Sequence, residues 1–217
     1  MRILTSSNQM LSEKAITNEF ELLLAKELNR RRVNVTLSRK RMELPSIQEQ
    51  IDLVCFSKPE WFGDSAAYYE WTKTPLINIE VIFVGEKSSP LINSMADIKG
   101  KRIGTIFGFR YPGLENLFHE QFALRDDAPN FESLIEKQLL QRTDYIVVRK
   151  FDFNFQKKKD ARLKDLRTSP FKLSTDTLYC GRIKSSNLTQ EELEAALARL
   201  QKRNVLEKIV AQYQDVN

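Results

Sequence analysis

The apolar positions at the start of the chain change from strand spacing to helical spacing and back. Residues 2–5 suit a strand, and residues 12–31 place apolar side chains on one face at helical spacing. Residues 33–37 then alternate apolar and polar side chains, and residues 52–56 form a continuous apolar run. This order of strand, helix and strand predicts a parallel sheet covered by helices.

A similar alternation returns in the second half of the chain. Residues 102–106 and 144–148 are predicted strands, and Asn130 is placed to cap a helix between them. Residues 173–182 are strand-like. Two helices follow, the first of which begins at a capping box over residues 189–192. The whole chain is therefore expected to be of the α/β class.

Two polar breaks divide the chain. They lie at residues 85–90 and at residues 168–170, and they enclose a central αβ unit. We therefore expect one lobe made of residues 1–85 and 171–217, and a second lobe made of residues 86–170. Two chain crossings between two α/β lobes form a hinge, and ligands bind in a cleft between such lobes.

Charge and hydropathy exclude several classes of protein. The 34 basic residues are interspersed with 29 acidic ones, so the net charge is only +5. Basic runs at residues 30–32, 39–41 and 157–159 have no recognition motif beside them, so we predict no nucleic-acid binding. No apolar stretch reaches the roughly 18 residues that a membrane span needs, so the protein is peripheral to a membrane at most. A monomer is expected.

The cysteine and histidine content argues against a metal site. The chain has two cysteines, Cys55 and Cys180, and a single histidine, His119. Structural zinc needs three or four nitrogen or sulfur ligands, so we predict neither a metal nor a cofactor. The two cysteines form a disulfide if the compartment is oxidising, or they remain two buried thiols. The sequence leaves both alternatives open.

The chain shows no motif of a common enzyme mechanism. It lacks the Gly-x-Ser-x-Gly elbow, and no Gly-Lys-Ser/Thr follows the glycines at positions 104 and 108. His119 is expected on a helix surface. Asp126 and Asp127 are expected in a loop, where they are solvated rather than poised for acid/base chemistry. We therefore predict that the protein is not an enzyme.

An aromatic segment is the first candidate ligand site. Residues 57–74 form a long stretch without regular periodicity, and it carries both tryptophans of the chain. Long irregular segments are usually functional or disordered, and aromatic richness argues against disorder. Trp61, Tyr69 and Trp71 therefore form a candidate apolar wall for a ligand. The alternative is that these aromatic rings pack onto their own lobe.

A turn between a strand and a helix is the second candidate. Phe109, Arg110 and Tyr111 lie in it, where backbone N–H groups at a helix start favour anions. Arg110 adds a bidentate donor for a carboxylate. Arg149, at the end of a buried strand, is a candidate second cation, and its alternative role is a salt bridge to Asp152. If both arginines face the ligand, the ligand is anionic.

Several segments carry a resemblance to a known family. Residues 97–104 read Asp-Ile-Lys-Gly-Lys-Arg-Ile-Gly, residues 69–76 hold an aromatic stretch that ends in Thr-Pro-Leu, and residues 142–146 read Arg-Thr-Asp-Tyr-Ile. Residues 178–179 and 209–213 follow in the family's order. Together these segments resemble periplasmic solute-binding proteins of the polar-amino-acid-transporter type. The resemblance implies a two-lobed type II periplasmic-binding fold, with a ligand cleft between the lobes and two hinge crossings.

The same resemblance indicates which ligand contacts are kept and which are replaced. Thr72 matches a small hydroxyl position that bonds the ligand in the family. The family follows its third strand with Thr-x-x-Arg, whose arginine grips a carboxylate, but residues 57–61 contain no arginine. Where the family holds the ligand amine with an aspartate, this chain has Arg149. We therefore expect a small anionic or carboxylate-bearing ligand rather than an ordinary α-amino acid.

These observations predict a periplasmic solute-binding protein. It would capture a small molecule by hinge closure and present it to the membrane subunits of an ABC transporter or to a sensor kinase. No charged-then-apolar leader precedes the strand at residues 2–5, so we expect the signal peptide to have been removed. The alternative is a cytoplasmic ligand-sensing effector domain of a transcription regulator. Reduced cysteines would favour that alternative.

Overall fold

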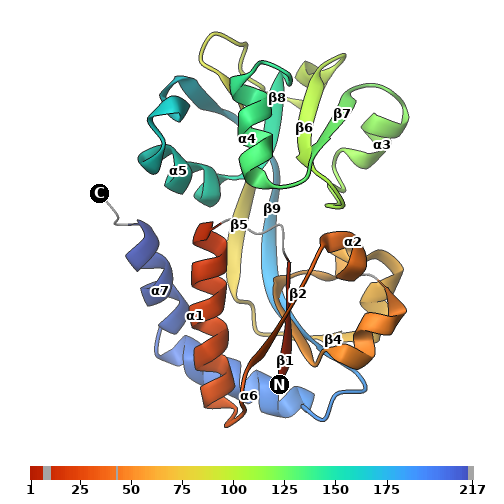
Figure 1. Ribbon diagram of the computed structural model, residues 1–217, viewed down its shortest axis with the longest axis vertical. Coiled ribbons are helices and arrows are strands. Elements are labelled where there is room, and N and C mark those ends of the chain that lie inside the picture. The colour runs from red at the N-terminus through yellow and green to blue at the C-terminus, as the bar shows by residue number, and fades with distance from the viewer. Residues whose placement is uncertain (7–10, 43, 215–217) are drawn as a thin grey trace. The chain divides into compact units, whose positions relative to one another are not determined.

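The chain folds into two compact α/β units (Figure 1). The structure is a computed structural model, and it describes residues 1–6, 11–42 and 44–214. Unit 1 consists of Met1–Asn78 and Thr177–Asn217, and unit 2 of Ile79–Asp176. The chain therefore passes from one unit to the other twice.

Both passages between the units lie inside long strands. Strand β5 (Ile77–Glu86) begins in unit 1 and continues into unit 2, and strand β9 (Leu166–Ile183) runs the other way. The side chains of Asn78 and Thr177 hydrogen-bond to each other beside these points, with Thr177 Oγ1 donating at 2.7 Å. The two units therefore share strands β5 and β9.

Unit 1 is built on a sheet in the order β2-β1-β3-β9, with β4 on the other side of β9. Strands β2 and β3 are parallel to β1, whereas β3 and β4 are antiparallel to β9. The predicted strands at 2–5, 33–37 and 52–56 are therefore confirmed as β1, β2 and β3. The elements of unit 1 besides β5 and β9 are β1 (Arg2–Ser6), α1 (Leu11–Glu27), β2 (Val33–Leu37), α2 (Arg39–Met42), η1 (Pro45–Gln50), β3 (Leu53–Ser57), η2 (Pro59–Trp61), η3 (Gly63–Tyr68), β4 (Tyr69–Trp71), α6 (Gln190–Lys202) and α7 (Val205–Gln214).

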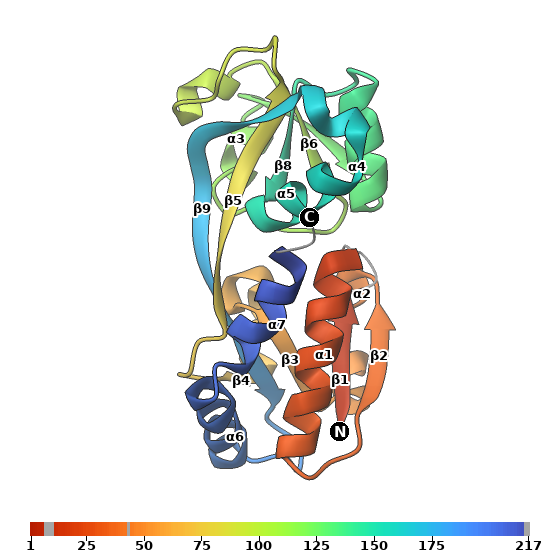
Figure 2. The same cartoon turned by 90° about the vertical axis from the view of Figure 1, so that its left-hand side faces the viewer.

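Helix α1 covers the sheet of unit 1 with the apolar face that its sequence predicts. Ile16, Phe20 and Leu24 are buried, and the Phe20 ring meets the Phe56 ring of β3 edge-on at 5.3 Å between centroids. Helices α6 and α7 pack against α1, as Figure 2 shows. The C-terminal segment is therefore part of the core of unit 1, although it follows unit 2 in the sequence.

Unit 2 is built on a sheet in the order β5-β8-β6-β7, and β9 pairs with β5 at its open side. Strands β6, β7 and β8 are parallel, and β5 is antiparallel to β8. Gly104 of β6 lies so close to its neighbours that a Cβ there would be 2.8 Å from Ile146 and Leu134. The remaining elements of unit 2 are η4 (Met95–Ile98), β6 (Arg102–Ile106), α3 (Glu115–His119), β7 (Leu124–Ala128), α4 (Phe131–Leu139), β8 (Tyr145–Arg149), α5 (Lys150–Lys159) and η5 (Ala161–Asp165).

Two local predictions for unit 2 are wrong. The expected break at residues 168–170 is instead the continuous strand β9, in which the buried Ser169 accepts the Ile92 N–H at 3.0 Å. Pro170 is tolerated there because β9 is the outer strand of unit 2, where a missing N–H leaves no ladder partner unpaired. Asp126 and Asp127 lie in strand β7 rather than in a loop.

The two cysteines form a disulfide bond between strands β3 and β9 of unit 1. Val54 pairs with Gly181, so the next position along each strand brings Cys55 and Cys180 directly opposite each other. Both residues are buried, with exposures of 5% and 0%. Of the two alternatives that the sequence leaves open, the structure has the disulfide.

A buried ion pair lies beneath α1. The Glu21 carboxylate is fully buried and accepts the Arg32 Nη2 at 2.7 Å and the Nε at 3.2 Å. Arg32 also donates from Nη1 to Asn18 at 2.5 Å. Burial raises the pKa of Glu21 from its ordinary 4.5 to about 7, and the nearby Arg32 only partly opposes this rise.

Replacing both cysteines by serine should lower the free energy of unfolding by about 2–5 kcal/mol, because the bond restricts the unfolded chain. Urea unfolding with and without dithiothreitol measures this difference. Reduction should lower the free energy of unfolding of the wild type to nearly that of Cys55→Ser/Cys180→Ser. The reductant should not change the free energy of unfolding of the double variant. A variant as stable as the oxidised wild type would contradict the expectation.

Glu21 should make the protein less stable as the pH rises. Between pH 4.5 and about 7 the folded state keeps a proton on Glu21 that the unfolded state has lost. The free energy of unfolding should therefore fall as the pH rises through this window, by about 3 kcal/mol. Denaturant unfolding at several pH values should show that Glu21→Gln flattens this slope. Glu132→Gln, at an exposed position of α4, should leave the slope unchanged.

Candidate functional site

The parallel strands of unit 2 bring two of the predicted ligand groups to one edge of the sheet. The 109–111 turn follows the carboxyl end of β6, and Arg149 ends β8. Gly104 pairs with Ile146, and the same register places Phe107 level with Arg149. Ligands of open α/β sheets bind outside the carboxyl ends of the strands, so this edge is the candidate site of unit 2.

The three residues of the predicted turn play different parts. Tyr111 is buried, and its hydroxyl accepts the Ile106 N–H at 3.1 Å. Burial raises the pKa of the Tyr111 hydroxyl to about 12. Phe109 packs against the core of unit 2, and Arg110 is exposed. Among the three, Arg110 is therefore the residue best placed to meet a ligand.

Phe107 is a neighbour of this turn that the sequence reading missed. It is 57% exposed, which is unusual for a phenylalanine beside the end of a buried strand. Its backbone N–H donates to the Ala128 carbonyl of β7 at 2.8 Å, so its position is fixed by the sheet. The sequence signal was available, because Phe107 directly follows the apolar run of β6.

Arg149 forms the salt bridge to Asp152 that is the alternative to a ligand contact. Its Nε donates to the Asp152 carboxylate of α5 at 2.6 Å, and the Asp152 side chain is only 5% exposed. The ion pair neutralises a buried acid and fixes the direction of the Arg149 side chain.

Arg125 of strand β7 holds the turn that carries Arg110. Its Nη2 donates to the Phe109 carbonyl at 2.9 Å, its Nε to Asp127 at 3.0 Å, and its Nη1 to Glu115 at 3.3 Å. The guanidinium also lies 5.8 Å from the Tyr111 ring centroid. Arg125 and Asp127 are two positions apart on one strand and so share a face, which is the only local sign of this cluster.

The aromatic residues of unit 1 pack mainly on one another. The Phe62 ring lies 5.0 Å from Tyr69 and 5.5 Å from Trp71, and Tyr69 is 3% exposed. Trp61 is partly buried, and the Lys58 ammonium lies 5.8 Å from its ring centroid. Tyr69 is therefore part of the core of unit 1, and Trp61 and Trp71 are both partly buried and pack against it.

Thr72 and Trp71 are bound closely to strand β9. The Thr72 hydroxyl donates to the Thr74 carbonyl at 3.1 Å and accepts the Cys180 N–H at 3.3 Å, and Thr72 is 4% exposed. The Trp71 ring lies over Gly181, where a Cβ would come within 3.1 Å of it. The Trp71 indole N–H is buried without a hydrogen-bond partner among the described residues.

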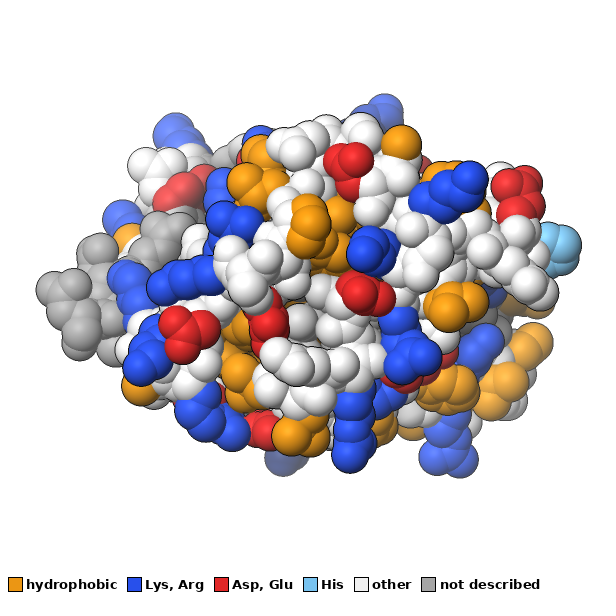
Figure 3. Space-filling view, turned by 90° about the horizontal axis from the view of Figure 1, so that it is seen from above, with side chains coloured by type: hydrophobic (Ala, Val, Ile, Leu, Met, Phe, Trp, Pro, Cys, Tyr) orange, Lys and Arg blue, Asp and Glu red, His pale blue; other side chains and the backbone are white. Residues whose placement is uncertain are grey.

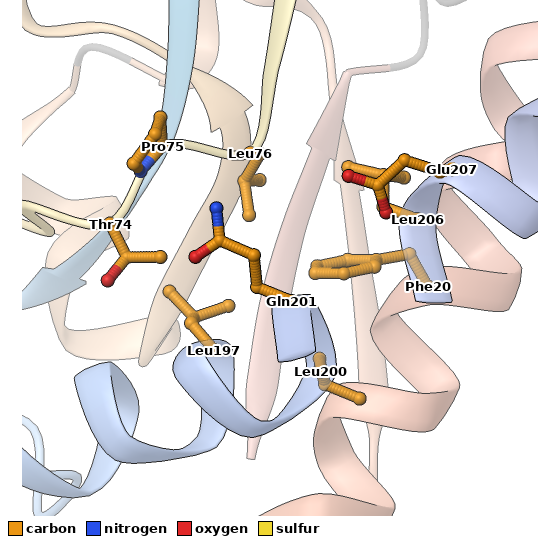
Figure 4. Close-up of a pocket in the computed structure, with 9 residues that line it drawn as sticks. All are labelled: Phe20, Thr74, Pro75, Leu76, Leu197, Leu200, Gln201, Leu206 and Glu207. Carbon is orange, nitrogen blue, oxygen red and sulfur yellow. The ribbon is translucent and has the colours of Figure 1, made fainter. Parts of the chain in front are cut away.

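A small pocket of unit 1 opens between α1, α6, α7 and the segment that leads into β5 (Figure 4). Most of its lining is aliphatic or aromatic. Thr74, Gln201 and Glu207 are its polar residues, and the Gln201 side chain points between Leu197 and Leu76. None of the eight residues proposed from the sequence lines it. The lining residues are Phe20, Thr74, Pro75, Leu76, Leu197, Leu200, Gln201, Leu206 and Glu207.

The surface carries charges of both signs. Figure 3 shows Lys and Arg side chains interleaved with Asp, Glu and apolar side chains on the face that it draws. Within the described ranges, no three His, Cys, Asp or Glu side chains are grouped to hold a metal ion. Among the described helices, none combines the length and the hydropathy that crossing a bilayer requires.

Comparison with known proteins identifies the fold. No protein family model and no curated protein sequence matches the chain. Solved structures match it over nearly its whole length, and the architecture of two α/β units is the type II periplasmic-binding fold. The predicted α/β class and two-lobed fold are thereby confirmed.

Three of these structures illustrate the likeness. The GluR0 ligand-binding core from Nostoc punctiforme in complex with L-glutamate has a TM-score of 0.78 and 12% identity, covering 99% of each chain. An ancestral arginine-binding protein bound to arginine has a TM-score of 0.81 and 16% identity, covering 98% of this chain and 97% of that one. The amino acid ABC transporter substrate-binding protein AbpA from Streptococcus pneumoniae, bound to L-arginine, has a TM-score of 0.76 and 17% identity, covering 98% and 92%.

Arg125→Met should loosen the turn at residues 107–111, because the Phe109 carbonyl and Glu115 lose a charged partner. A loss of about 1–2 kcal/mol of local stability would raise amide exchange in the turn roughly 5- to 30-fold. Hydrogen exchange followed by mass spectrometry measures this rate. Arg142→Met, at an exposed position before β8, serves as the control and should leave exchange in the turn unchanged.

Proposed function

We propose that this protein is a solute-binding protein that captures a small anionic or carboxylate-bearing ligand and catalyses no reaction. The observation that carries the proposal is the likeness of the whole chain to ligand-bound binding proteins, at TM-scores of 0.76 to 0.81. In those structures the bound molecules are L-glutamate or arginine. Ligand capture without chemistry also agrees with the sequence, in which we find no nucleophile paired with a general acid or base.

The distribution of charge at the unit 2 edge favours an anion. Its carboxylates already have cationic partners, since Arg125 pairs with Glu115 and Asp127, and Arg149 pairs with Asp152. Arg110 is exposed on the turn beside them. A ligand carboxylate at this edge would therefore meet guanidinium groups rather than unpaired acids.

Unit 1 would contribute an aromatic surface to the ligand rather than an arginine that binds the ligand carboxylate. Trp61 stands near the position where related binding proteins have their carboxylate-binding arginine, and Lys58 lies over its ring. Thr72 and Tyr69 would act indirectly, because both are buried and hold Trp71 and β9 in place.

The disulfide supports a location outside the cytoplasm. Disulfides persist in oxidising compartments such as the periplasm and are rare in the cytosol. The bond between Cys55 and Cys180 therefore favours a periplasmic binding protein over a cytoplasmic effector domain of a transcription regulator. In the periplasm, the membrane subunits of an ABC importer or a sensor kinase would be the partners of the ligand-bound form.

A thermal-shift screen of carboxylates, amino acids and oligopeptides tests this function. A true ligand at 100 times its Kd should add about 2.7 kcal/mol to the free energy of unfolding. Arg110→Ala should remove most of the shift caused by an anionic ligand, while the melting temperature of the unliganded protein stays within the error of the wild-type value. Arg142→Ala is the matched control and should bind as the wild type does.

Two results would overturn the proposal. A protein that responds to no compound of the screen would not support solute capture. An Arg110→Ala variant that keeps the full shift would reject the anionic ligand while leaving solute capture in place.

A further inference from the structure

The segment between β4 and β5 leaves strand β9 for a short distance. The Thr72 N–H donates to the Cys180 carbonyl at 2.9 Å, and the Leu76 N–H donates to the Leu178 carbonyl at 2.8 Å. The chain thus takes four residue steps from Thr72 to Leu76, whereas β9 takes two from Cys180 to Leu178. Two residues are therefore in excess, and their backbone N–H groups have no place in the ladder.

The Glu194 carboxylate of helix α6 accepts hydrogen bonds from the two backbone N–H groups that are unpaired in the ladder. Glu194 Oε1 accepts the Lys73 N–H at 2.5 Å, and Oε2 accepts the Thr74 N–H at 3.2 Å. Gln190, one helical turn earlier, donates to the Trp71 carbonyl at 3.1 Å and to Glu194 Oε1 at 3.3 Å. The two α6 side chains therefore bind the backbone of Trp71, Lys73 and Thr74 in succession.

Helix α6 is a rigid support for this contact. A capping box joins Thr189 and Glu192 at its start, and Leu193, Ala196 and Leu197 are buried in unit 1. Hydrogen bonds from the 73–74 segment and Gln190 keep the pKa of Glu194 below its usual value, against the opposing effect of burial. Figure 4 shows the 74–76 segment facing the Leu197 and Gln201 side chains of the same helix.

We propose that Glu194 is a positioning residue, whose carboxylate holds the bulged 73–74 segment and thereby fixes Trp71 and Thr72 against β9 in unit 1. This proposal rests on the proposed function, because Trp71 is a candidate ligand residue only if the protein captures a solute. The contact itself is independent of that function.

A carboxylate is required because both of its oxygens accept. Glutamine at position 194 keeps the size of the side chain but replaces one acceptor by an NH₂ group, which would face a backbone N–H. The bulge would then lose one bond and gain a repulsive donor pair. If the NH₂ group takes the Oε1 place, Gln190 also loses its bond to residue 194 and keeps only its bond to the Trp71 carbonyl. In either orientation the segment next to Trp71 is held less firmly.

Tryptophan fluorescence tests the proposal without any ligand. The chain has only two tryptophans, so Trp61→Phe leaves Trp71 as the single reporter. In this background, Glu194→Gln should shift the emission to longer wavelength and raise the acrylamide quenching constant by about twofold, as a locally loosened segment does. Glu191→Gln removes the same charge from an exposed position of the same helix and should leave both quantities unchanged.

A milder variant covers the case in which Glu194→Gln does not fold. Gln190→Ala removes the bond to the Trp71 carbonyl and keeps the Glu194 charge, so it should shift the emission in the same direction by a smaller amount. Circular dichroism confirms that each variant is folded. Unchanged emission and quenching in both folded variants would overturn the proposal.

Ligand binding separates this proposal from the proposed function. L-Glutamate and L-arginine are used as probes, together with any compound that stabilises the wild type in the screen. Glu194→Gln should raise the Kd for such a compound about tenfold, and it should lower the melting temperature less than a core variant does. If the wild type binds none of the compounds, solute capture fails, and the fluorescence result still decides whether Glu194 positions Trp71.

Discussion

Strand β9 is the element on which both units depend. In unit 1 it lies between β3 and β4, and in unit 2 it pairs with β5 at the open side of the sheet. The disulfide joins it to β3 at Cys180, and the N–H of the same residue donates to the Thr72 hydroxyl. A change in the register of β9 would therefore move the core of unit 1 and the candidate ligand segment together.

Charged side chains from distant parts of the sequence hold both candidate ligand segments. Arg125 of β7 binds the Phe109 carbonyl in the turn of unit 2, and Glu194 of α6 binds the Lys73 and Thr74 N–H groups in unit 1. In each case the strand ladder ends, and a helix or a neighbouring strand supplies an ionised partner for the backbone that it leaves unpaired. Irregular backbone is thereby kept in one conformation.

This arrangement bears on the chemistry of the proposed ligand. The acids of the unit 2 edge are neutralised within the protein, and most of the aromatic rings of unit 1 are used for packing. Arg110 and Phe107 are the exposed residues of the segment that follows β6. An exposed guanidinium and an exposed apolar ring in the same segment are consistent with the proposed carboxylate-bearing ligand.

The sequence by itself determined the α/β class, most strands and helices, and the turn that carries Arg110, because apolar periodicity and capping are local properties of the chain. It did not determine that residues 168–170 lie inside a strand or that Asp126 and Asp127 lie in β7. Both segments are outer strands, where polar residues and proline are tolerated and the apolar pattern is lost. The disulfide, the Arg125 cluster and the Glu194 contact were decided only by the tertiary structure. Each of them depends on contacts that strand register and helix packing bring together, such as Arg125 with the Phe109 carbonyl and Glu194 with the Lys73 N–H.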